Sequence, residues 1–372
     1  SYKMKHNFLN RPSKMEMGWR AYAERFIDDR QTGFTGDSVY TPDAREGVYF
    51  RGSGDSLEIL GTSHHYETMA LSGFISESID FGTFTLRPGL RLELFEQERV
   101  DRMQGSLYQD KTLFVMLPGI AFSKSYNNLN VFGGIHRGFT PPSSGALKIL
   151  NFGEGLEDSG LDLDSERSWN KEFGVRGKSS LIDYEIAGFH IDIENLVAAG
   201  RGTAFKNLGK VTTQGLELRT SLLLSNVFSL LPNIDVSYAF LSTEVKDATI
   251  ISNVSGTYGS EVSINGKELP YSPDHTVTVG LEYNINSKVN LRGDLRYVSE
   301  VYTDFENIEE TDNIGVSGPI PSYSILNISG SYQLGTQLKL FFSGKNIADE
   351  IYIGSRLHSN PGQKDANISS GI

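Results

Sequence analysis

Arginine is the residue type in this sequence whose number and spacing are best suited to binding a ligand. Three arginines fall within 22 positions of one long connecting segment, one lies near the end of a predicted strand, and one lies in a further connecting segment. They are Arg30, Arg45, Arg51, Arg137 and Arg201. A guanidinium group donates paired hydrogen bonds to a carboxylate or a phosphate. If the chain binds an anionic ligand, these five arginines are the candidate ligand-binding residues.

Aromatic residues accompany the first three arginines. The same segment carries four rings that could pack over a bound ligand: Phe34, Tyr40, Tyr49 and Phe50. Each arginine also has an ordinary explanation, because a solvated charge in a connecting segment needs no ligand.

Other chemistry is poorly represented. The sequence has no Cys, no HExxH zinc motif, no Gly-rich phosphate loop and no nucleophile motif. His64 and His65 follow a segment with Asp55 and Glu58, which would suit a metal ion, but a hydrated strand end is the simpler interpretation. No catalytic residue, no metal-binding residue and no cofactor are predicted.

The arginines must be positioned by β-strands, because apolar and polar residues alternate along most of the chain. From Phe84 to Leu94 the even-numbered residues are apolar and the odd-numbered ones are Thr, Arg, Gly, Arg and Glu. Side chains on a strand point to alternate faces, so each segment has one apolar and one polar wall. The predicted strands are 1–9, 14–26, 64–79, 84–96, 111–122, 129–139, 168–178, 182–193, 210–222, 233–244, 275–284, 289–298, 322–333 and 336–345, with a further one beginning near 366.

The connections between these strands alternate between tight turns and long segments. The long segments are 27–63, 97–110, 140–167, 194–209, 245–274, 299–321 and 346–365. This alternation is typical of an outer-membrane β-barrel, whose short turns face the periplasm and whose long loops face outward. One wall should then face lipid, with Phe84, Leu86, Leu90, Leu92, Val277, Val279, Leu281, Leu291, Leu295, Leu338, Leu340 and Phe342. The other should face the lumen, with Arg87, Arg91, Glu93, Arg292, Asp294 and Arg296.

Composition agrees with this interpretation and excludes others. The chain has 372 residues, 38% of them hydrophobic, and no apolar run approaches the roughly 20 residues of a spanning helix. Aromatic residues make up 11% of the chain, which suits the interfacial girdles of a barrel. A formal net charge of −12 disfavours nucleic acid as a partner. A large soluble β-sandwich or lectin-like fold is the alternative, although such folds rarely keep a strict short–long alternation.

Four motifs in family order resemble TonB-dependent outer-membrane receptors. They are Asn130–Pro142, which ends in an aromatic residue and a Pro pair; Leu163–Arg176, with the pattern E-x-S-x-N-x-E-x-G-x-R; Asn207–Leu218, with N-x-G and a later G-x-E; and Lys345–Tyr352, with N-x-x-D-x-x-Y. Asp164 and Ser165 depart from the Pro that usually stands there. The segments Glu268–His275 and Phe74–Glu93 resemble the ferric-dicitrate branch of these receptors.

The resemblance implies an all-β fold: a transmembrane antiparallel β-barrel of about 22 strands with a plugged lumen. Residues 1–372 would form the C-terminal part of that barrel, about fifteen strands, with the N-terminal plug absent and the sheet open. Glu172, Arg176, Glu217 and Arg219 would face the lumen.

The resemblance also implies a function. The receptor would sit in the outer membrane of a Gram-negative bacterium, bind a ferric chelate at its outer loops and import it with energy from the TonB–ExbB–ExbD complex. Iron would be cargo, and membrane lipid and lipopolysaccharide would surround the barrel. A passive porin and an outer-membrane barrel hydrolase remain alternatives. Two segments are acidic and contain no basic residue: Glu154–Glu166 and Glu300–Asp312. They argue against an anionic chelate, because they would repel it.

Overall fold

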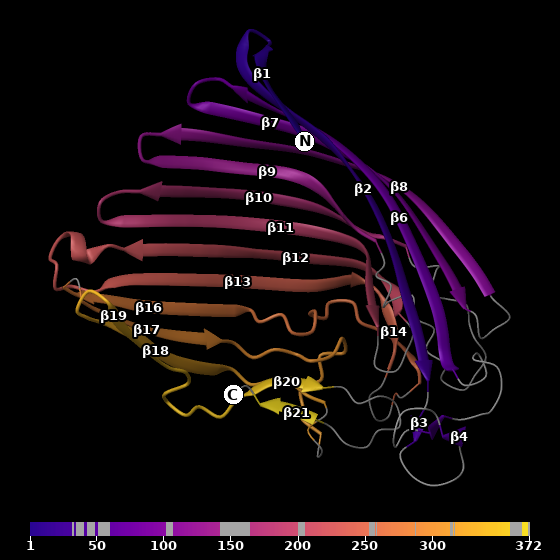
Figure 1. Cartoon of the computed structure of the whole chain (residues 1–372). Coiled ribbons are helices and arrows are strands. Elements are labelled where there is room, and N and C mark those ends of the chain that lie inside the picture. The colour runs from indigo at the N-terminus through magenta and orange to yellow at the C-terminus, as the bar shows by residue number, and fades with distance from the viewer. Residues whose placement is uncertain are drawn as a thin grey trace.

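The chain forms one large, strongly curved antiparallel sheet in a computed structural model (Figure 1). The structure describes residues 1–31, 33–34, 41–42, 49–50, 60–101, 107–141, 164–199, 205–252, 257, 259–286, 288–312, 315, 317–357 and 367–370. Fourteen strands follow one another in sequence order from β1 (Tyr2–Phe8) to β19 (Leu338–Gly344). Since β1 and β19 are the two edges, the sheet is open, as predicted.

The twelve strands between these edges match the predicted ones. They are β2 (Arg11–Gln31), β6 (Leu60–Asp80), β7 (Phe84–Asp101), β8 (Leu107–Tyr126), β9 (Leu129–Thr140), β10 (Glu166–Lys178), β11 (Ile182–Ala199), β12 (Phe205–Leu222), β13 (Asn233–Asp247), β16 (His275–Ile285), β17 (Val289–Val298) and β18 (Tyr323–Leu334). All fourteen predicted strands that precede the segment near 366 are confirmed.

Several strands run further toward the long connections than the alternation predicts. The pattern predicts that β2 ends near residue 26, whereas the strand continues to Gln31. Arg25 and Glu67 lie opposite each other near that end, and Arg25 Nε donates to Glu67 Oε1 at 2.7 Å. Above the lipid an outward side chain need not be apolar, so the hydrophobic alternation stops before the hydrogen-bond ladder does.

The tight turns all lie at one end of the sheet, which runs from the top of Figure 1, at the turn between β1 and β2, down its left side. Between β1 and β2 the turn residues Leu9 and Asn10 have φ angles of 51° and 59°, which matches a two-residue hairpin turn with both central residues left-handed. The long connections leave from the opposite end, as the alternation predicts.

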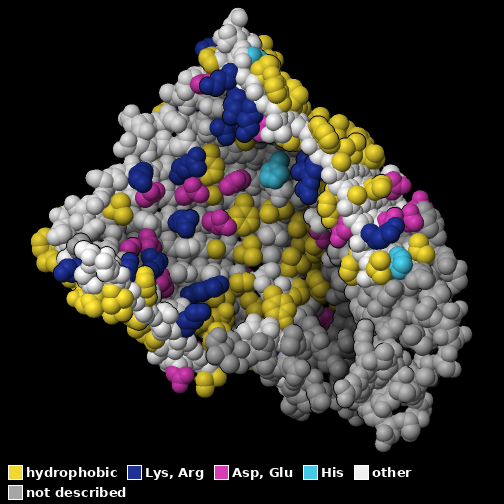
Figure 2. All heavy atoms as spheres, viewed as in Figure 1, with side chains coloured by type: hydrophobic (Ala, Val, Ile, Leu, Met, Phe, Trp, Pro, Cys, Tyr) yellow, Lys and Arg dark blue, Asp and Glu magenta, His cyan; other side chains and the backbone are white. Residues whose placement is uncertain are grey.

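The register assigns every strand residue to one of two walls, because directly paired residues point the same way. Arg87 lies opposite Ala121, Ala121 opposite Gly134, and Gly134 opposite Glu172. All these positions belong to the concave wall, where Figure 2 shows Lys, Arg, Asp and Glu side chains interspersed in the hollow. The predicted lipid-facing residues all fall on the convex wall, and the predicted lumen residues all fall on the concave one. Leu92, Leu295 and Leu340 remain 38%, 47% and 50% exposed there.

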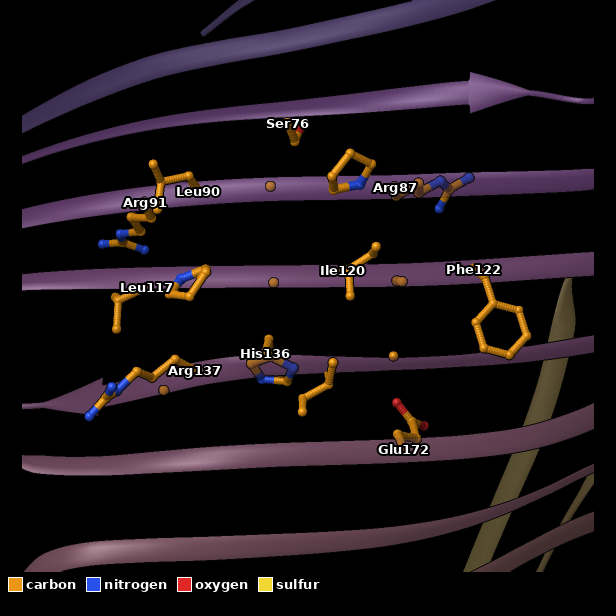
Figure 3. A pocket seen from close by; sticks show the side chains of 18 of the residues that line it. Ser76, Arg87, Leu90, Arg91, Leu117, Ile120, Phe122, His136, Arg137 and Glu172 are labelled. Carbon is orange, nitrogen blue, oxygen red and sulfur yellow. The ribbon is translucent and has the colours of Figure 1, made fainter.

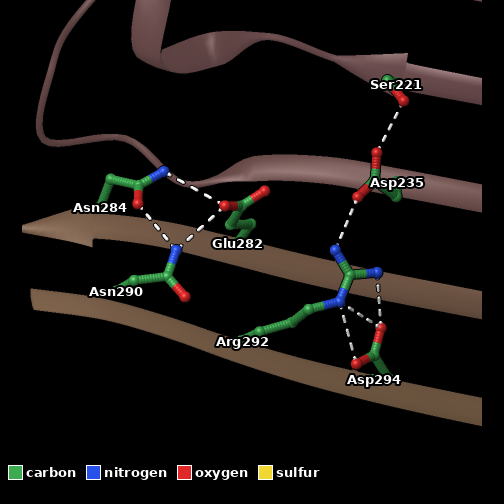
Figure 4. A network of polar contacts seen from close by, with 7 residues as sticks. All are labelled: Ser221, Asp235, Glu282, Asn284, Asn290, Arg292 and Asp294. Carbon is green, nitrogen blue, oxygen red and sulfur yellow. Dashed lines mark hydrogen bonds and ion pairs between the residues drawn. The ribbon is translucent and has the colours of Figure 1, made fainter. Parts of the chain in front are cut away.

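An ion-pair network stabilises the concave wall where β12, β13, β16 and β17 meet (Figure 4). Arg292 Nη1 donates to Asp235 Oδ2 at 3.0 Å, and Arg292 Nε donates to Asp294 at 2.9 and 3.0 Å. Ser221 completes the network with a 2.6 Å bond to Asp235. Gly280 stands between the two acids, and a Cβ there would lie 2.7 Å from Arg292 Nη2. The absence of a side chain at this position is therefore what lets the guanidinium cross β16.

The segment near 366 does not join the barrel sheet, which corrects the expectation of a fifteenth strand. Asn367–Ser370 (β21) pairs with Ile353–Leu357 (β20) in a separate two-stranded sheet. Its backbone groups instead pair within the long connection.

Small elements fill the other long connections. They are β3 (Gly33–Phe34), β4 (Thr41–Pro42), β5 (Tyr49–Phe50), β14 (Thr249–Ile251) and β15 (Glu261–Ser263). A 3-10 turn, η2 (Leu224–Asn226), lies in the short connection between β12 and β13. In the described part of the chain, no helix has the length and apolar character to cross a membrane.

The assignment of walls predicts opposite outcomes for charges at neighbouring positions of β17. Leu291→Arg places a cation on the convex wall and should lower the free energy of unfolding by ~2–4 kcal/mol near the bilayer midplane. Asn290→Arg is the matched control, because residue 290 points into the lumen beside Glu282 and should change that free energy little. Urea titration of the intact receptor in phospholipid vesicles measures both. Equal losses for the two variants would contradict the assignment.

Candidate functional site

The structure describes two of the five candidate arginines, Arg30 and Arg137. Arg45, Arg51 and Arg201 lie outside the described residues. Arg30 lies in β2, opposite Thr62 of β6, one residue before an irregularity in the register. This places its backbone near the end of the sheet from which the long connections leave.

Arg137 lies on the convex wall of β9, facing away from the lumen. It is opposite Trp169, its guanidinium carbon lies 5.6 Å from the centre of that ring, and Nη2 is 3.8 Å from Glu194 Oε2. The neighbouring His136 points into the lumen instead, since it lies opposite Gly119. Neighbouring residues of a strand point to opposite faces, so a shift of one residue decides whether a side chain faces the lumen. A position near the end of a strand does not by itself show which face the side chain is on.

A wall pocket opens in the concave face between β6 and β10 (Figure 3). We use this name for the hollow of about 820 Å³ whose floor is bare backbone at Gly89, Gly119 and Gly134, with Ala121 beside them. Gly89 lies opposite Gly119, and Ala121 opposite Gly134, so small residues adjoin one another across three strands. Four neighbouring positions without bulky side chains are what hollow the wall here.

Charged groups frame the wall pocket on both sides. Arg91 forms an ion pair with Glu93, which is 8% exposed. Across the pocket, Arg176 stacks 5.3 Å above Phe132 and approaches Glu185 at 3.8 Å. This pocket is not among the sites predicted from the sequence. Its signal is present as small residues at lumen-facing positions, but only the register shows that these positions are neighbours.

The long connections 245–274 and 299–321 form a packed loop cluster against the concave wall. Its core combines the wall residues Val211 and Val245 with loop residues, each at most 8% exposed: Ala248, Ile250 and Ile264. Polar bonds fix the cluster. Ser252 is fully buried and donates to Glu306 at 2.9 Å, while the Asn307 amide pairs with both backbone groups of Glu268 at 2.7 and 3.0 Å. The described residues of these connections therefore pack as part of the wall's outer end.

Arg356 ties a third connection to this cluster. Its side chain is 4% exposed and donates to Gly315 O at 2.6 Å, Pro319 O at 2.9 Å and Thr311 Oγ1 at 3.4 Å. Its own carbonyl accepts a 2.8 Å bond from the Tyr271 hydroxyl. The guanidinium group is thus held by backbone and hydroxyl oxygens of connection 299–321, at and just after the end of the acidic segment Glu300–Asp312.

The loop cluster concentrates negative charge. Burial raises the pKa of the Tyr302 phenol, and so do the surrounding carboxylates, in the order Glu268, Glu309, Glu300 and Asp274. Burial, and then repulsion by Asp274, raises the pKa of Glu268 above its ordinary value. The part of the acidic surface that the structure describes therefore lies beside β13, β16 and β17. Residues 154–163 of the other acidic segment lie outside the described residues.

In the described part of the chain, no group of three or more His, Asp or Glu residues is arranged to hold a metal ion. His64 and His65 lie in β6, whereas Asp55 and Glu58 are outside the described residues.

This geometry defines a class of protein: membrane-spanning antiparallel β-barrels, whose wall is apolar outside and charged inside. The chain belongs to the TonB dependent receptor-like, beta-barrel family, whose model it matches over residues 5–347. Members of that family are receptors and transporters of the outer membrane of Gram-negative bacteria.

The chain is also similar to known receptors and transporters, in fold or in sequence. The ferric citrate transporter FecA in the unliganded form superposes with a TM-score of 0.77 at 19% identity, covering 100% of this chain and 51% of that one. The siderophore receptor PiuA from Acinetobacter baumannii gives 0.73 at 15% identity, covering 99% and 53%. Catecholate siderophore receptor Fiu of Escherichia coli (strain K12) is 21% identical over 220 residues, which are 58% of this chain and 26% of Fiu. The chain spans about half the length of the two solved structures.

Removal of the Arg356 side chain should loosen the loop cluster. Arg356→Ala deletes three hydrogen bonds from a charged donor and should lower the free energy of loop opening by about 3 kcal/mol. Amide hydrogen exchange of Val301 and Ile320, which bond each other at 2.8 and 3.0 Å, reports that opening. Lys345→Ala removes an exposed cation directly after β19 and serves as the control. Unchanged exchange in Arg356→Ala would show that the cluster does not depend on this side chain.

Acidification should tighten the same cluster. Because the folded state raises the pKa of Glu268, its stabilising contribution is complete below the ordinary value of 4.5 and is lost as pH rises through the raised value. The amides of Glu268 and Leu269, corrected for intrinsic exchange, should be better protected at about pH 4 than at about pH 7. Glu268→Gln should remove this difference, and Glu350→Gln, at an exposed position, should keep it. A pH-independent parent would refute the assignment.

Proposed function

We propose that the chain is the barrel wall of an outer-membrane receptor that binds a ferric chelate at its outer loops and imports it with energy from the TonB–ExbB–ExbD complex. The observation that carries this proposal is the match to the receptor family over residues 5–347, together with a wall that is apolar outside and charged inside. Iron is the cargo and needs no resident cofactor.

The packed loop cluster favours a receptor over a passive porin. A passive channel needs an open mouth, whereas here connections 245–274 and 299–321 bury a common core against the inner wall. Ordered loops provide the preformed surface that binding requires, because less conformational entropy is then lost on association. Membership of a family of receptors and transporters also favours this function over a barrel hydrolase.

The names of several relatives favour an iron chelate as the ligand, without indicating which one. FecA is named for ferric citrate and Fiu for catecholate siderophores. Both kinds of complex carry net negative charge, which suits binding by Arg30, Arg45, Arg51 and Arg201. The acidic loop cluster lies beside β13 to β17, so we place the anion on the side of β2 and β6, where the segment with the first three arginines leaves the sheet.

The mechanism that we propose begins with capture at the outer mouth, continues with loop closure, and ends with displacement of a plug by TonB. The plug would be carried by a part of the receptor outside residues 1–372, which would then be the C-terminal part of the barrel. Outer-membrane lipid and lipopolysaccharide would contact the convex wall. Uptake of radioactive ferric citrate by cells with and without TonB tests this sequence, and uptake that is independent of TonB would overturn it.

Loss of the arginines of the long connecting segment should weaken binding of the ferric chelate. In the intact receptor, Arg30→Ala, Arg45→Ala or Arg51→Ala should reduce the free energy of ferric citrate binding by ~1.5–3 kcal/mol for each residue that makes a charged hydrogen bond. The corresponding Lys variants should recover only part, because the planar fork is lost. Isothermal titration with ferric citrate and with a cationic siderophore measures this.

The control is Arg25→Ala, which removes a cation already bonded to Glu67 on the convex wall. Parent-like binding in all three loop variants, or a parent that ignores ferric citrate, would exclude the citrate assignment and leave the wider receptor family.

A further inference from the structure

Like charges lie side by side on the concave wall near the tight turns of β1, β2, β6 and β7. Lys5 lies directly opposite Lys14, and Lys14 lies opposite Ser78. Arg87 lies on the other side of Ser78, since the flanking pairs of β6 and β7 keep one constant offset. We call Lys5, Lys14 and Arg87 the basic row. Directly opposed like charges destabilise a sheet, so their presence calls for a physical reason.

The basic row differs from the charges elsewhere on the same wall. On β10 to β12, Lys178 lies 3.2 Å from Asp183 and Arg176 lies 3.8 Å from Glu185. Arg292 contacts two carboxylates at 3.0 Å or less. Within the described residues, by contrast, no carboxylate comes within 4.0 Å of a basic-row nitrogen. Even Glu16, which neighbours Lys14 along β2, is engaged by Lys3 at 3.3 Å.

The three side chains line a common hollow of about 550 Å³ that also contains Ser78 and Asp80. Asp80 Oδ1 accepts a 2.7 Å bond from the Gly82 amide and so caps the tight turn. The hollow keeps a formal excess of positive charge, with three cations against one carboxylate among the residues that line it. It is open to the lumen and offers a hydroxyl group between two cations.

Arg87 connects this hollow to the wall pocket, because it lines both. The two hollows therefore follow one another along the inner wall, from the middle of β7 to the tight-turn end. That end is opposite the loops at which we place ligand capture.

We propose that the basic row is a second binding site, for the free carboxylates of an anionic chelate that passes along the inner wall. An ammonium group at residue 14 and a guanidinium group at residue 87 can each donate to one carboxylate over Ser78, and the guanidinium can do so with two parallel bonds. The chemical class of ligand is a polycarboxylate. This inference deepens the proposed function and rests on it for the direction of transport, but the site itself is testable without transport.

Protection of lysines from an amine-reactive reagent tests the site in the purified full-length receptor, with iron-free citrate as the probe. Labelling of Lys14, read by mass spectrometry, should slow by about tenfold when citrate is about ten times its dissociation constant, since only the empty site reacts. Lys339 on the concave wall of β19 is the internal control and should label at one rate throughout. Glycerol, which has the carbon chain of a polyol and no carboxylate, should protect neither lysine.

Variants separate the site from a general effect of charge. Arg87→Gln should weaken citrate protection of Lys14 by about tenfold, because a charge-assisted bidentate bond is lost. Arg296→Gln removes an equal charge from the concave wall of β17 and should leave protection unchanged. No protection by citrate in the parent, or equal loss in both variants, would overturn the proposal.

A competing occupant gives a different result. If carboxylates of a protein domain in the lumen already occupy the basic row, Lys14 will be protected before citrate is added and citrate will change nothing, which also overturns the proposal. Failure of the proposed function remains distinguishable: a receptor that does not import ferric citrate would fail the cellular uptake assay and still show citrate protection of Lys14.

Discussion

Backbone hydrogen bonding in lipid is the constraint on which the rest of this structure depends. An unpaired amide or carbonyl group has no water to bond inside a bilayer, so each strand must pair with both of its neighbours or lie at an edge. The twelve inner strands of the fourteen-stranded sheet meet this demand in unbroken sequence order, and β1 and β19 are its two edges. Because the ladder fixes the direction of every side chain, it also fixes which residues meet lipid and which meet the lumen.

The concave wall is electrically uneven, and this unevenness is a property of the register. From β10 to β17 cations lie beside carboxylates, as in the network of Arg292 with Asp235 and Asp294. Gly280 makes that network sterically feasible by leaving room between the two acids. Near the tight turns of β1 to β7, cations face each other instead. Most cations of the wall are thus neutralised by neighbouring carboxylates, whereas the basic row keeps a positive field that attracts an anion.

The outer end of the barrel is organised by apolar burial rather than by charge. Val211 and Val245 belong to the strands, yet they are almost wholly buried because connections 245–274 fold back over them. This core holds the acidic residues of the cluster on one side of the mouth. Burial, and then repulsion by the neighbouring carboxylate of Asp274, raises the pKa of Glu268. An anionic ligand would therefore meet repulsion on that side and attraction on the side of the predicted arginine segment.

The sequence by itself determined the fold class, the walls and the family, because alternation with a period of two is a local property that each strand displays independently. It predicted all fourteen sheet strands and the wall of residues such as Leu92 and Arg292. It failed where several strands must be aligned with one another. The outward position of Arg137, the bare floor of the wall pocket and the row of Lys5, Lys14 and Arg87 depend on which residues of different strands lie opposite. The pairing of β21 with β20, and the burial of Arg356 among oxygens of another connection, likewise arise from contacts between distant segments. Register and loop packing are decided by the tertiary structure, since they minimise the free energy of the whole sheet rather than of any one strand.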